Sequence, residues 1–211
     1  MQGRPGLSPR YGHILEPEAL ESLRHALRRM NRGMLLMWRL GLGWTAGIWP
    51  RGFGRLLVIE HTGRKSGSRY LTPVNYTIVG DDLYCLAGFG RRTDWFQNVL
   101  ARPECAVWLP DGRWVAVGED VSDNPRRLDL IRRVLIDSGF AAPLVGLHPH
   151  HIGDGDLTEA TASYRLLHIR PTARQDADHG PGDLAWVWRP LGAALAVGFV
   201  LWKIGRRRAA G

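Results

Sequence analysis

The sequence predicts an α+β fold that is mainly β, a small barrel of about six strands with helices packed outside it. Short runs rich in β-branched and aromatic residues recur between residues 56 and 169, and glycine, proline and aspartate separate them. Apolar residues at helical spacing occur before, between and after these runs. With 211 residues, 45% of them apolar and 23% charged, the chain can bury one core.

Residues 1–52 are predicted to form a basic N-terminal extension that is first amphipathic and then apolar. A helix is expected from Pro17 to near Gly33, because leucines recur at helical spacing with arginines between them. An apolar stretch rich in tryptophan and glycine follows from Met34 to Pro50. This extension either lies on an anionic bilayer or packs on the core of its own chain, and the sequence leaves both interpretations open.

Residues 53–171 are predicted to form the barrel domain. Between its strands, Thr93 or Asp94 caps a short helix that Pro103 stops, and Gly139 ends a longer one. A loop-rich stretch follows the longer helix. The strands are expected at residues 56–60, 70–79, 83–87, 105–109, 113–119 and 164–169, and the two helices at residues 93–102 and 122–139.

The positive charge of the chain is concentrated near its N-terminus. The net charge is +8, from 28 basic and 20 acidic side chains. Residues 1–70 hold 12 basic and 4 acidic side chains, whereas the remainder holds 16 of each. Such asymmetry predicts an anionic partner, either a membrane surface, a nucleic acid or a cofactor. Because the sequence carries no recognised base-reading motif, no nucleic-acid partner is predicted.

The cysteine and histidine residues predict no disulfide or metal chemistry. Cys85 and Cys105 fall in strand-like runs and are expected to be small buried hydrophobes. His148, His150 and His151 lack the ligand spacing of a metal site, so no metal is predicted. No secretory signal opens the chain, and a cytoplasmic location is therefore expected.

The segment between the first two expected strands, residues 60–69, reads Glu-His-Thr-Gly-Arg-Lys-Ser-Gly-Ser-Arg. Its glycines allow tight turns. Arg64, Lys65 and Arg69 supply cations that can hold an anion such as a cofactor phosphate, and Ser66 adds a hydroxyl. An ATP-type phosphate loop and a G-x-G-x-x-G dinucleotide motif are both absent. The competing interpretation is a solvated basic turn.

Three segments carry a family resemblance by their order and spacing. They are residues 61–67 (HTGRKSG), 70–76 (YLTPVNY) and 88–100 (GFGRRTDWFQNVL). Together they resemble the deazaflavin (F420)-dependent nitroreductase and quinone reductase family, a branch of the split β-barrel, FMN-binding-like fold. The resemblance covers residues 50–122 well, extends to residue 169 with less specificity, and does not include the C-terminal tail.

The resemblance implies coenzyme F420, a deazaflavin with a phosphate and an oligoglutamate tail, as the cofactor. Arg91 and Arg92 are placed by their charge to meet the glutamate carboxylates. The matched positions imply a phosphate site, two sides of the deazaflavin ring and two residues that close the pocket. In that order, the implied cofactor-binding residues are Arg64, Lys65, Ser66 and Gly67 with help from Arg69; Pro73, Val74 and Asn75; Ala87, Gly88, Phe89 and Gly90; and Trp95 and Asn98.

The resemblance also implies an oxidoreductase that moves a hydride from reduced F420 to a quinone, a nitroaromatic compound or another activated conjugated acceptor. The cofactor carries that chemistry, which agrees with the lack of a serine, cysteine or metal constellation. No proton donor can be named, although the hydroxyl of Tyr76 is a candidate. An FMN-dependent reductase on the same fold and a non-catalytic cofactor-binding protein are the alternatives. His61 either titrates near neutral pH or is structural.

Residues 172–183 are expected to be a polar linker and residues 184–211 an apolar C-terminal segment with a basic end. The stretch from Leu184 to Ile204 has about the length needed to cross a bilayer, but Arg189 and Pro190 interrupt it. It therefore either crosses a membrane as an anchor, lies on a membrane surface or docks on the barrel. A lipid-soluble quinone would suit a membrane-near enzyme, and the oligomeric state, monomer or homodimer, stays open.

Overall fold

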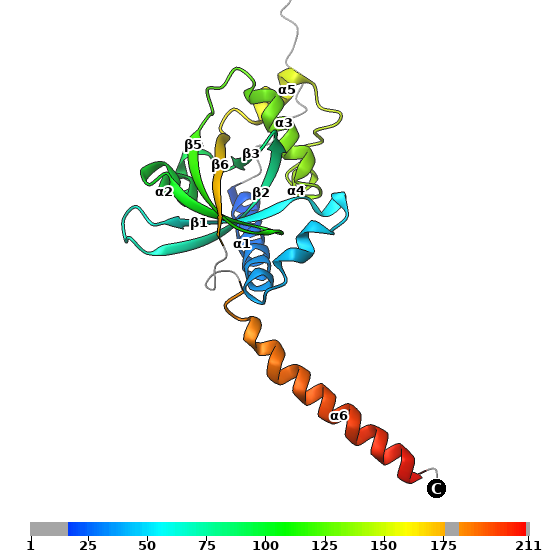
Figure 1. Ribbon diagram of the computed structural model, residues 1–211. Helices are drawn as coiled ribbons and strands as arrows, with labels where there is room; N and C mark the ends of the chain where they lie inside the picture. The colour runs from blue at the N-terminus through cyan, green and yellow to red at the C-terminus, as the bar shows by residue number, and fades with distance from the viewer. Residues whose placement is uncertain (1–16, 176–181, 210–211) are drawn as a thin grey trace, which may run out of the picture.

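The computed structural model of the protein describes residues 17–175 and 182–209. Its centre is a closed antiparallel barrel with the strand order β1-β2-β3-β6-β5-β4, surrounded by helices (Figure 1). The predicted α+β barrel is confirmed. The strands are β1 (Leu56–Thr62), β2 (Arg69–Val79), β3 (Asp82–Ala87), β4 (Glu104–Leu109), β5 (Gly112–Asp120) and β6 (Arg165–Gln175).

Each expected strand is present, and β6 is longer than the sequence predicts. It continues through the first residues of the expected linker, 172–183, because its end pairs with β5. Ala173 lies opposite Val115, and Gln175 lies opposite Arg113. The pairing is irregular between Val115 and Ala116, as at a β-bulge. Polar side chains there signal a solvent-exposed strand end rather than a break in the sheet.

One apolar cluster fills the interior of the barrel. Strand alternation sends every second side chain inward, and the helix α2 (Asp94–Ala101) adds Phe96 and Val99 to the same core. Both cysteines are buried and unbonded to each other, as expected. Burial raises the pKa of the Cys105 thiol to about 12. The buried members are Leu57, Ile59, Val74, Tyr76, Leu83, Cys85, Ala87, Phe96, Val99, Cys105, Val107, Ala116, Leu167 and Ile169.

The helix α3 (Arg127–Asp137) starts later than the residues 122–139 expected from sequence. Ser122 does not cap it. Its hydroxyl instead binds Asp120 Oδ1 and accepts a hydrogen bond from the backbone N–H of Leu166, which ties the end of β5 to β6. The stretch expected to be loop-rich contains two short helices, α4 (Ala141–Leu144) and α5 (Asp154–Ala160). They pack with α3 in a second apolar cluster outside the barrel.

The N-terminal helix α1 (Pro17–Arg39) passes through Gly33, where the sequence predicts its end. Gly33 is exposed, and a Cβ at this position would meet nothing within 4 Å. Beyond it, Leu35, Met37 and Trp38 pack against Val58 and the outer side of the barrel. That contact offsets the low helix propensity of glycine, about 1 kcal/mol relative to alanine. This end of the extension therefore packs on its own chain.

Three short 3-10 helices connect these elements: η1 (Gly43–Gly47), η2 (Arg51–Phe53) and η3 (Gly90–Arg92). A fourth, η4 (Ala185–Val187), precedes the C-terminal helix α6 (Trp188–Ala209). Three polar contacts hold the start of this segment at the end of α1, the first of them a hydrogen bond from the Leu184 N–H to Arg39 O over 2.8 Å. Arg39 forms an ion pair with Asp183, and Trp188 Nε1 donates to Leu40 O over 2.8 Å.

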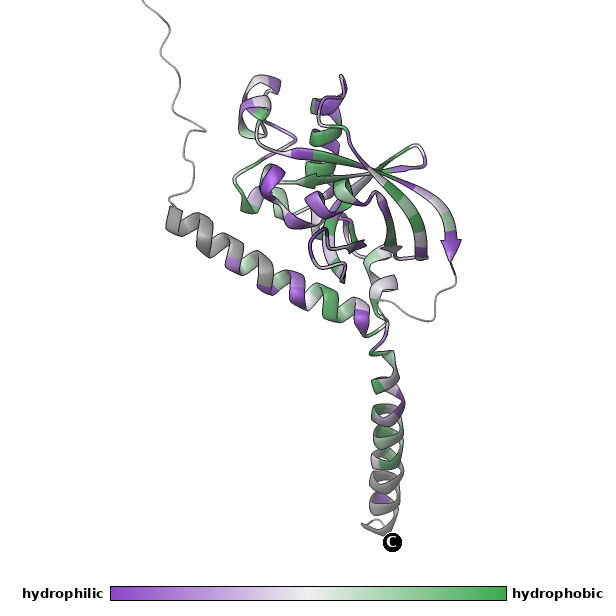
Figure 2. Ribbon diagram, turned by 90° about the vertical axis from the view of Figure 1, so that its left-hand side faces the viewer, coloured by the Kyte–Doolittle hydropathy of each residue, from purple (hydrophilic) through white to green (hydrophobic). Residues whose placement is uncertain are grey.

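Beyond that junction, α6 extends away from the barrel and does not dock on it (Figures 1 and 2). Much of its described surface is hydrophobic, as the green stretches in Figure 2 show. Among the helices in the described parts of the chain, none is both long enough and apolar enough to pass through a bilayer.

Candidate functional site

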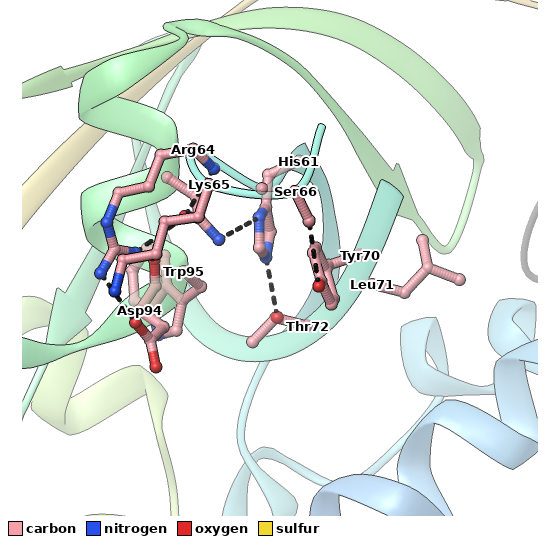
Figure 3. Close-up of a pocket in the computed structure, with 11 residues that line it drawn as sticks. His61, Arg64, Lys65, Ser66, Tyr70, Leu71, Thr72, Asp94 and Trp95 are labelled. Atoms are coloured by element: carbon pink, nitrogen blue, oxygen red, sulfur yellow. Dashed lines mark hydrogen bonds and ion pairs between the residues drawn. The ribbon is translucent and has the colours of Figure 1, made fainter. Parts of the chain in front are cut away.

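A cavity of about 460 Å³ opens where the loop between β1 and β2 meets the start of α2 (Figure 3). The hairpin contributes basic, aromatic and hydroxyl side chains, and α2 contributes the opposite wall. The lining thus combines hydrogen-bonding and charged groups with the apolar surfaces of Tyr70, Leu71 and Trp95, and a small molecule could use both. The lining residues are His61, Gly63, Arg64, Lys65, Ser66, Tyr70, Leu71, Thr72, Asp94, Trp95 and Asn98.

The basic loop is a tight turn that two glycines make possible. The Gly67 N–H donates to Gly63 O over 2.9 Å, and the Gly63 N–H donates to Ser68 O over 2.8 Å. Gly67 has a φ of 68°, in the left-handed region that favours glycine. A Cβ on Gly63 would lie 2.6 Å from the ring of Tyr70 and 2.7 Å from Ser66 Oγ. The loop can therefore close against Tyr70 only with glycine at position 63.

Asn98, in α2, holds the loop from the other side of the cavity. Its Oδ1 accepts hydrogen bonds from the backbone N–H of Arg64 over 3.1 Å and from Arg64 Nη1 over 2.9 Å. The side chain is 6% exposed. A buried amide with these partners is costly to remove, because the backbone N–H of Arg64 would lose its acceptor. Asn98 is thus a brace between α2 and the basic loop.

The Arg64 guanidinium is already neutralised within the chain. Its Nη2 lies 3.0 Å from Asp94 Oδ1. The sequence suggests Asp94 as a helix cap, but Thr93 occupies the cap position and Asp94 is the first residue of α2. A carboxylate at the N-terminus of a helix also interacts favourably with the helix dipole. Asp94 is therefore the counter-ion of Arg64.

Lys65 differs from Arg64, since it makes no hydrogen bond or ion pair with the described residues. The backbone N–H groups of Lys65 and Ser66 also have no partner within the parts of the chain that the structure describes. Ser66 Oγ lies 3.3 Å from the Tyr70 hydroxyl and accepts from the Ser68 N–H. Adjacent free N–H groups beside an ammonium can bind an anion.

His61 lies on the floor of the cavity and is 4% exposed. Its Nε2 is 3.0 Å from Thr72 Oγ1, and its Nδ1 is 3.3 Å from Asn98 Nδ2. The ring stacks on Tyr70 with centroids 5.9 Å apart. Burial lowers the pKa of His61 from 6.5 to about 4. Titration near neutral pH, one of the two interpretations left open by the sequence, is therefore wrong.

Five of the residues predicted to bind the cofactor line the cavity: Arg64, Lys65, Ser66, Trp95 and Asn98. Gly67 belongs to the same turn without lining the cavity.

Arg69 lies on the other face of β2 from Tyr70, since side chains alternate along a strand. There it forms an ion pair with Glu60, with Arg69 Nη2 2.6 Å from Glu60 Oε2. The structure thus separates Arg69 from the cavity.

The residues predicted along one side of the ring do not line the cavity either. Val74 and Tyr76 point into the barrel core, and Asn75 donates from Nδ2 to Arg55 O over 3.1 Å. Pro73 is buried opposite Val58 of β1. Burial raises the pKa of the Tyr76 hydroxyl. Its place in the core gives no support to Tyr76 as a proton donor at this cavity.

The segment from residue 87 to residue 92 also lies apart from the cavity lining. Ala87 is buried in the barrel core, and Gly88 and Phe89 are exposed. A Cβ on Gly90 would lie 2.6 Å from Ser163 O, so this turn packs on the segment that precedes β6. Arg91 and Arg92 are exposed on η3, just before α2. They can reach only a ligand that extends beyond the cavity.

Six residues that line the cavity are not among those predicted to bind the cofactor: His61, Gly63, Tyr70, Leu71, Thr72 and Asp94. Strand alternation was the available signal for two of them. Tyr70 and Thr72 share the face of β2 that continues inward to Val74. Leu71 lies on the other face, where it also packs against the cluster around Trp38. Its place at the cavity follows only from the tertiary structure.

Comparison with known proteins agrees with the sequence resemblance. Residues 42–136 match the family model described as F420H(2)-dependent quinone reductase. This match confirms the predicted family resemblance, the oxidoreductase class and F420 as the cofactor. No curated protein sequence matches the chain.

Solved structures with a similar arrangement include an F420-H2 dependent reductase, with 14% identity, a TM-score of 0.40 and coverage of 55% of this chain and 93% of that one. An F420 reductase has 17% identity and a TM-score of 0.40, and covers 58% and 90% of the two chains. The heme storage protein HutZ from Vibrio cholerae has 12% identity and a TM-score of 0.41, and covers 58% and 85%.

Proposed function

Since residues 42–136 match the model of the F420H(2)-dependent quinone reductase family, we propose that this chain transfers a hydride from reduced F420 to a quinone, a nitroaromatic compound or another activated conjugated acceptor. The observation that carries the proposal is the ammonium of Lys65 beside two backbone N–H groups, all without a partner among the described residues, at one end of a cavity with aromatic walls. An anionic, ring-bearing cofactor needs both features.

The phosphate of the cofactor would be held by Lys65, by the N–H groups of Lys65 and Ser66, and by the Ser66 hydroxyl. Arg64 contributes less directly, because Asp94 and Asn98 already occupy its guanidinium. We assign it the role of shaping the loop. These residues fit the phosphate, because Lys65 forms no ion pair with the described residues. The phosphate therefore does not have to break an existing ion pair in order to bind Lys65.

The deazaflavin ring would lie against the apolar and aromatic walls of the cavity. Tyr70 comes from β2 and Trp95 from α2 (Figure 3), and Leu71 also borders the cavity. The remaining predicted ring contacts, Pro73 to Asn75 and Ala87 to Gly90, stay predictions. They require a ligand that extends beyond the cavity, or a change of the neighbouring loops on binding.

When bound, reduced F420 supplies the hydride, and the acceptor also takes up a proton to become the quinol. The chain's part is to orient the ring, to neutralise the phosphate and to leave room for the acceptor. His61 stays neutral above a pH of about 4, so it does not serve as a charged acid at neutral pH. We propose that the proton comes from water, which reaches the open cavity.

A titration of the purified protein with F420 tests this proposal. Lys65→Ala should weaken F420 binding by about 1.5–3 kcal/mol, the range for hydrogen bonds to charged groups. Lys203→Ala, which removes the other lysine of the chain, is the matched control and should leave affinity unchanged. Equal affinities of the wild type and Lys65→Ala would contradict the phosphate site.

Two further measurements separate the alternatives on the same fold. Titration with FMN compares the two ring-and-phosphate cofactors directly, and tighter binding of FMN would favour an FMN-dependent reductase. Mixing the protein with reduced F420 and a menaquinone analogue should restore the absorbance of oxidised F420. Tight F420 binding with no turnover on quinone or nitroaromatic acceptors would instead favour a non-catalytic cofactor-binding protein.

We also propose that α6 lies along an anionic bilayer surface, which would bring the enzyme near lipid-soluble quinones. Leu191, Leu195 and Val197 are 48%, 67% and 59% exposed. The apolar stretch from residue 191 to residue 202 spans roughly 18 Å as a helix, short of the hydrocarbon thickness. An arginine run follows at residues 206–208, and such a pattern favours anionic lipid.

Vesicle co-sedimentation tests the surface role. The wild type should sediment with vesicles that contain phosphatidylglycerol and less with pure phosphatidylcholine, and added salt should weaken the association. The double substitution Leu191→Glu with Leu195→Glu should abolish it. Leu144→Glu, at an exposed apolar residue of α4, is the control. Unchanged sedimentation of the double variant would exclude α6 as the contact.

A further inference from the structure

The hydrogen bonds around Asn98 determine which end of its side-chain amide faces His61. Two N–H donors of Arg64 point at one atom of that amide, over 3.1 and 2.9 Å. Only an oxygen can accept them, so this atom is Oδ1. The nitrogen Nδ2 therefore faces His61, and it carries only donor hydrogens.

The orientation of Asn98 in turn determines the tautomer of His61. Because Nδ2 can only donate, the His61 Nδ1 atom 3.3 Å away must accept. A neutral imidazole carries its one proton on the other nitrogen, so Nε2 is protonated and donates to Thr72 Oγ1 over 3.0 Å. Burial lowers the pKa of His61 to about 4, which keeps the ring neutral at pH 7.

Thr72 is left with a hydroxyl hydrogen and no acceptor for it among residues 17–175 and 182–209. The side chain is half-buried and lines the cavity beside Tyr70 (Figure 3). Its oxygen is already used as an acceptor from His61. The free hydrogen is thus available to a ligand in the cavity.

We infer that Thr72 is a positioning residue that donates a hydrogen bond to a carbonyl oxygen of the bound ligand, with its hydroxyl oriented by the relay Arg64–Asn98–His61. The inference rests on the proposed function for the identity of the ligand. The carbonyl belongs either to the deazaflavin ring or to the acceptor. A fixed donor beside an acceptor carbonyl stabilises the negative charge that forms on its oxygen when the hydride arrives.

The relay can be tested without any ligand by ¹⁵N NMR of the histidine-labelled protein at pH 7. The signals of His61 are those that disappear in His61→Gln. The wild type should show a protonated Nε2 and a bare Nδ1. Asn98→Asp should place a proton on Nδ1, since a carboxylate can only accept. A bare Nε2 or a doubly protonated ring in the wild type would overturn the relay.

The donor role is tested with Thr72→Val, which removes the hydroxyl and keeps the shape, and Thr72→Ser, which restores a hydroxyl. Loss of one hydrogen bond should cost about three- to tenfold. The loss appears in F420 affinity if the carbonyl is on the cofactor, and in kcat/KM for the quinone at saturating F420 if it is on the acceptor. Thr172→Val, in the exposed part of β6, is the control and should change neither.

Unchanged F420 affinity and unchanged acceptor kinetics in Thr72→Val would overturn the inference while leaving the proposed function intact. A wild type that binds no F420 would overturn the proposed function, and the donor role of Thr72 would fall with it. The NMR spectra would still decide the tautomer of His61 in that case, because they need no cofactor.

Discussion

The two faces of the β1–β2 hairpin each carry basic side chains, and they use them differently. On the outer face, Glu60 binds Arg69, with Oε2 2.6 Å from Nη2, and Arg113, with Oε1 2.9 Å from Nη2. Trp108 Nε1 also donates to it. On the cavity face, Lys65 has no such partner within the described chain. The outer cations are neutralised by the protein, whereas Lys65 is available to a ligand.

The role of each cation therefore depends on its charge partners and not on its position in the sequence. Burial by itself would raise the pKa of Glu60, but hydrogen bonds from Arg113 and Trp108 outweigh it and the pKa is lowered. The carboxylate is therefore charged at neutral pH and satisfies the arginines. Lys65 and Arg69 are close in sequence, yet Lys65 lines the cavity and Arg69 belongs to an ion-pair cluster.

Glu60→Gln should break the outer cluster and produce the largest change in stability. It leaves the poorly exposed Arg113 without its carboxylate, and loss of one partner of a buried pair costs about 3 kcal/mol. Urea unfolding would measure this loss. F420 affinity should change by no more than about twofold, or ~0.4 kcal/mol, because Glu60 does not line the cavity. A stable variant with weak F420 binding would reverse the assignment of the two faces.

Acid should destabilise the cavity face before the outer face. The pKa of His61 is lowered from 6.5 to about 4, so the unfolded chain binds a proton there first. The free energy of unfolding should therefore fall as the pH drops below 6.5, by about 2 kcal/mol between pH 7.5 and 5. Glu60 loses its contribution only at lower pH, as its lowered pKa is approached.

Urea unfolding of the wild type and of His61→Gln at pH 7.5 and pH 5 measures the contribution of His61 to this pH dependence, because the variant lacks the titrating ring. The difference in unfolding free energy between the two proteins should change with pH by the stated amount. A pH-independent difference would mean that His61 titrates alike in the folded and unfolded chains.

Tyr70→Phe, on the cavity face, should have a smaller effect on F420 affinity than Lys65→Ala. It removes the hydroxyl that lies 3.3 Å from Ser66 Oγ and keeps the ring that stacks on His61. F420 affinity should fall by about 0.5–1 kcal/mol, the value of one neutral hydrogen bond, through a less ordered Ser66. Fluorescence titration would measure the fall. Affinity equal to that of the wild type would show that Ser66 needs no support from Tyr70.

Arg69→Gln should have the smallest effect on the cofactor. Arg69 is half-exposed and faces Glu60, away from the cavity, so F420 affinity should change by less than about 0.5 kcal/mol. Arg69→Lys is the conservative control. A loss as large as that of Lys65→Ala would restore the assistance to the phosphate that the family resemblance implies for Arg69.

The sequence alone predicted the barrel strands because each strand signal is local. Alternating apolar residues and intervening turns mark β1 to β6, and the glycines around Arg64 and Lys65 mark the basic loop. The length of β6 and the start of α3 were not predictable. They depend on pairing with β5 and on the Ser122 contact to Leu166, between residues far apart in sequence.

What the sequence determined by itself was the barrel, the basic composition of its first hairpin loop and, through the order of three motifs, a family resemblance. Only the tertiary structure decided that Asp94 pairs with Arg64, that Glu60 pairs with Arg69 and that Lys65 has no partner in the described parts of the chain. Strand pairing and helix packing bring those charges together across the chain. Charge pairing falls off with distance in space, and a linear sequence does not record that distance.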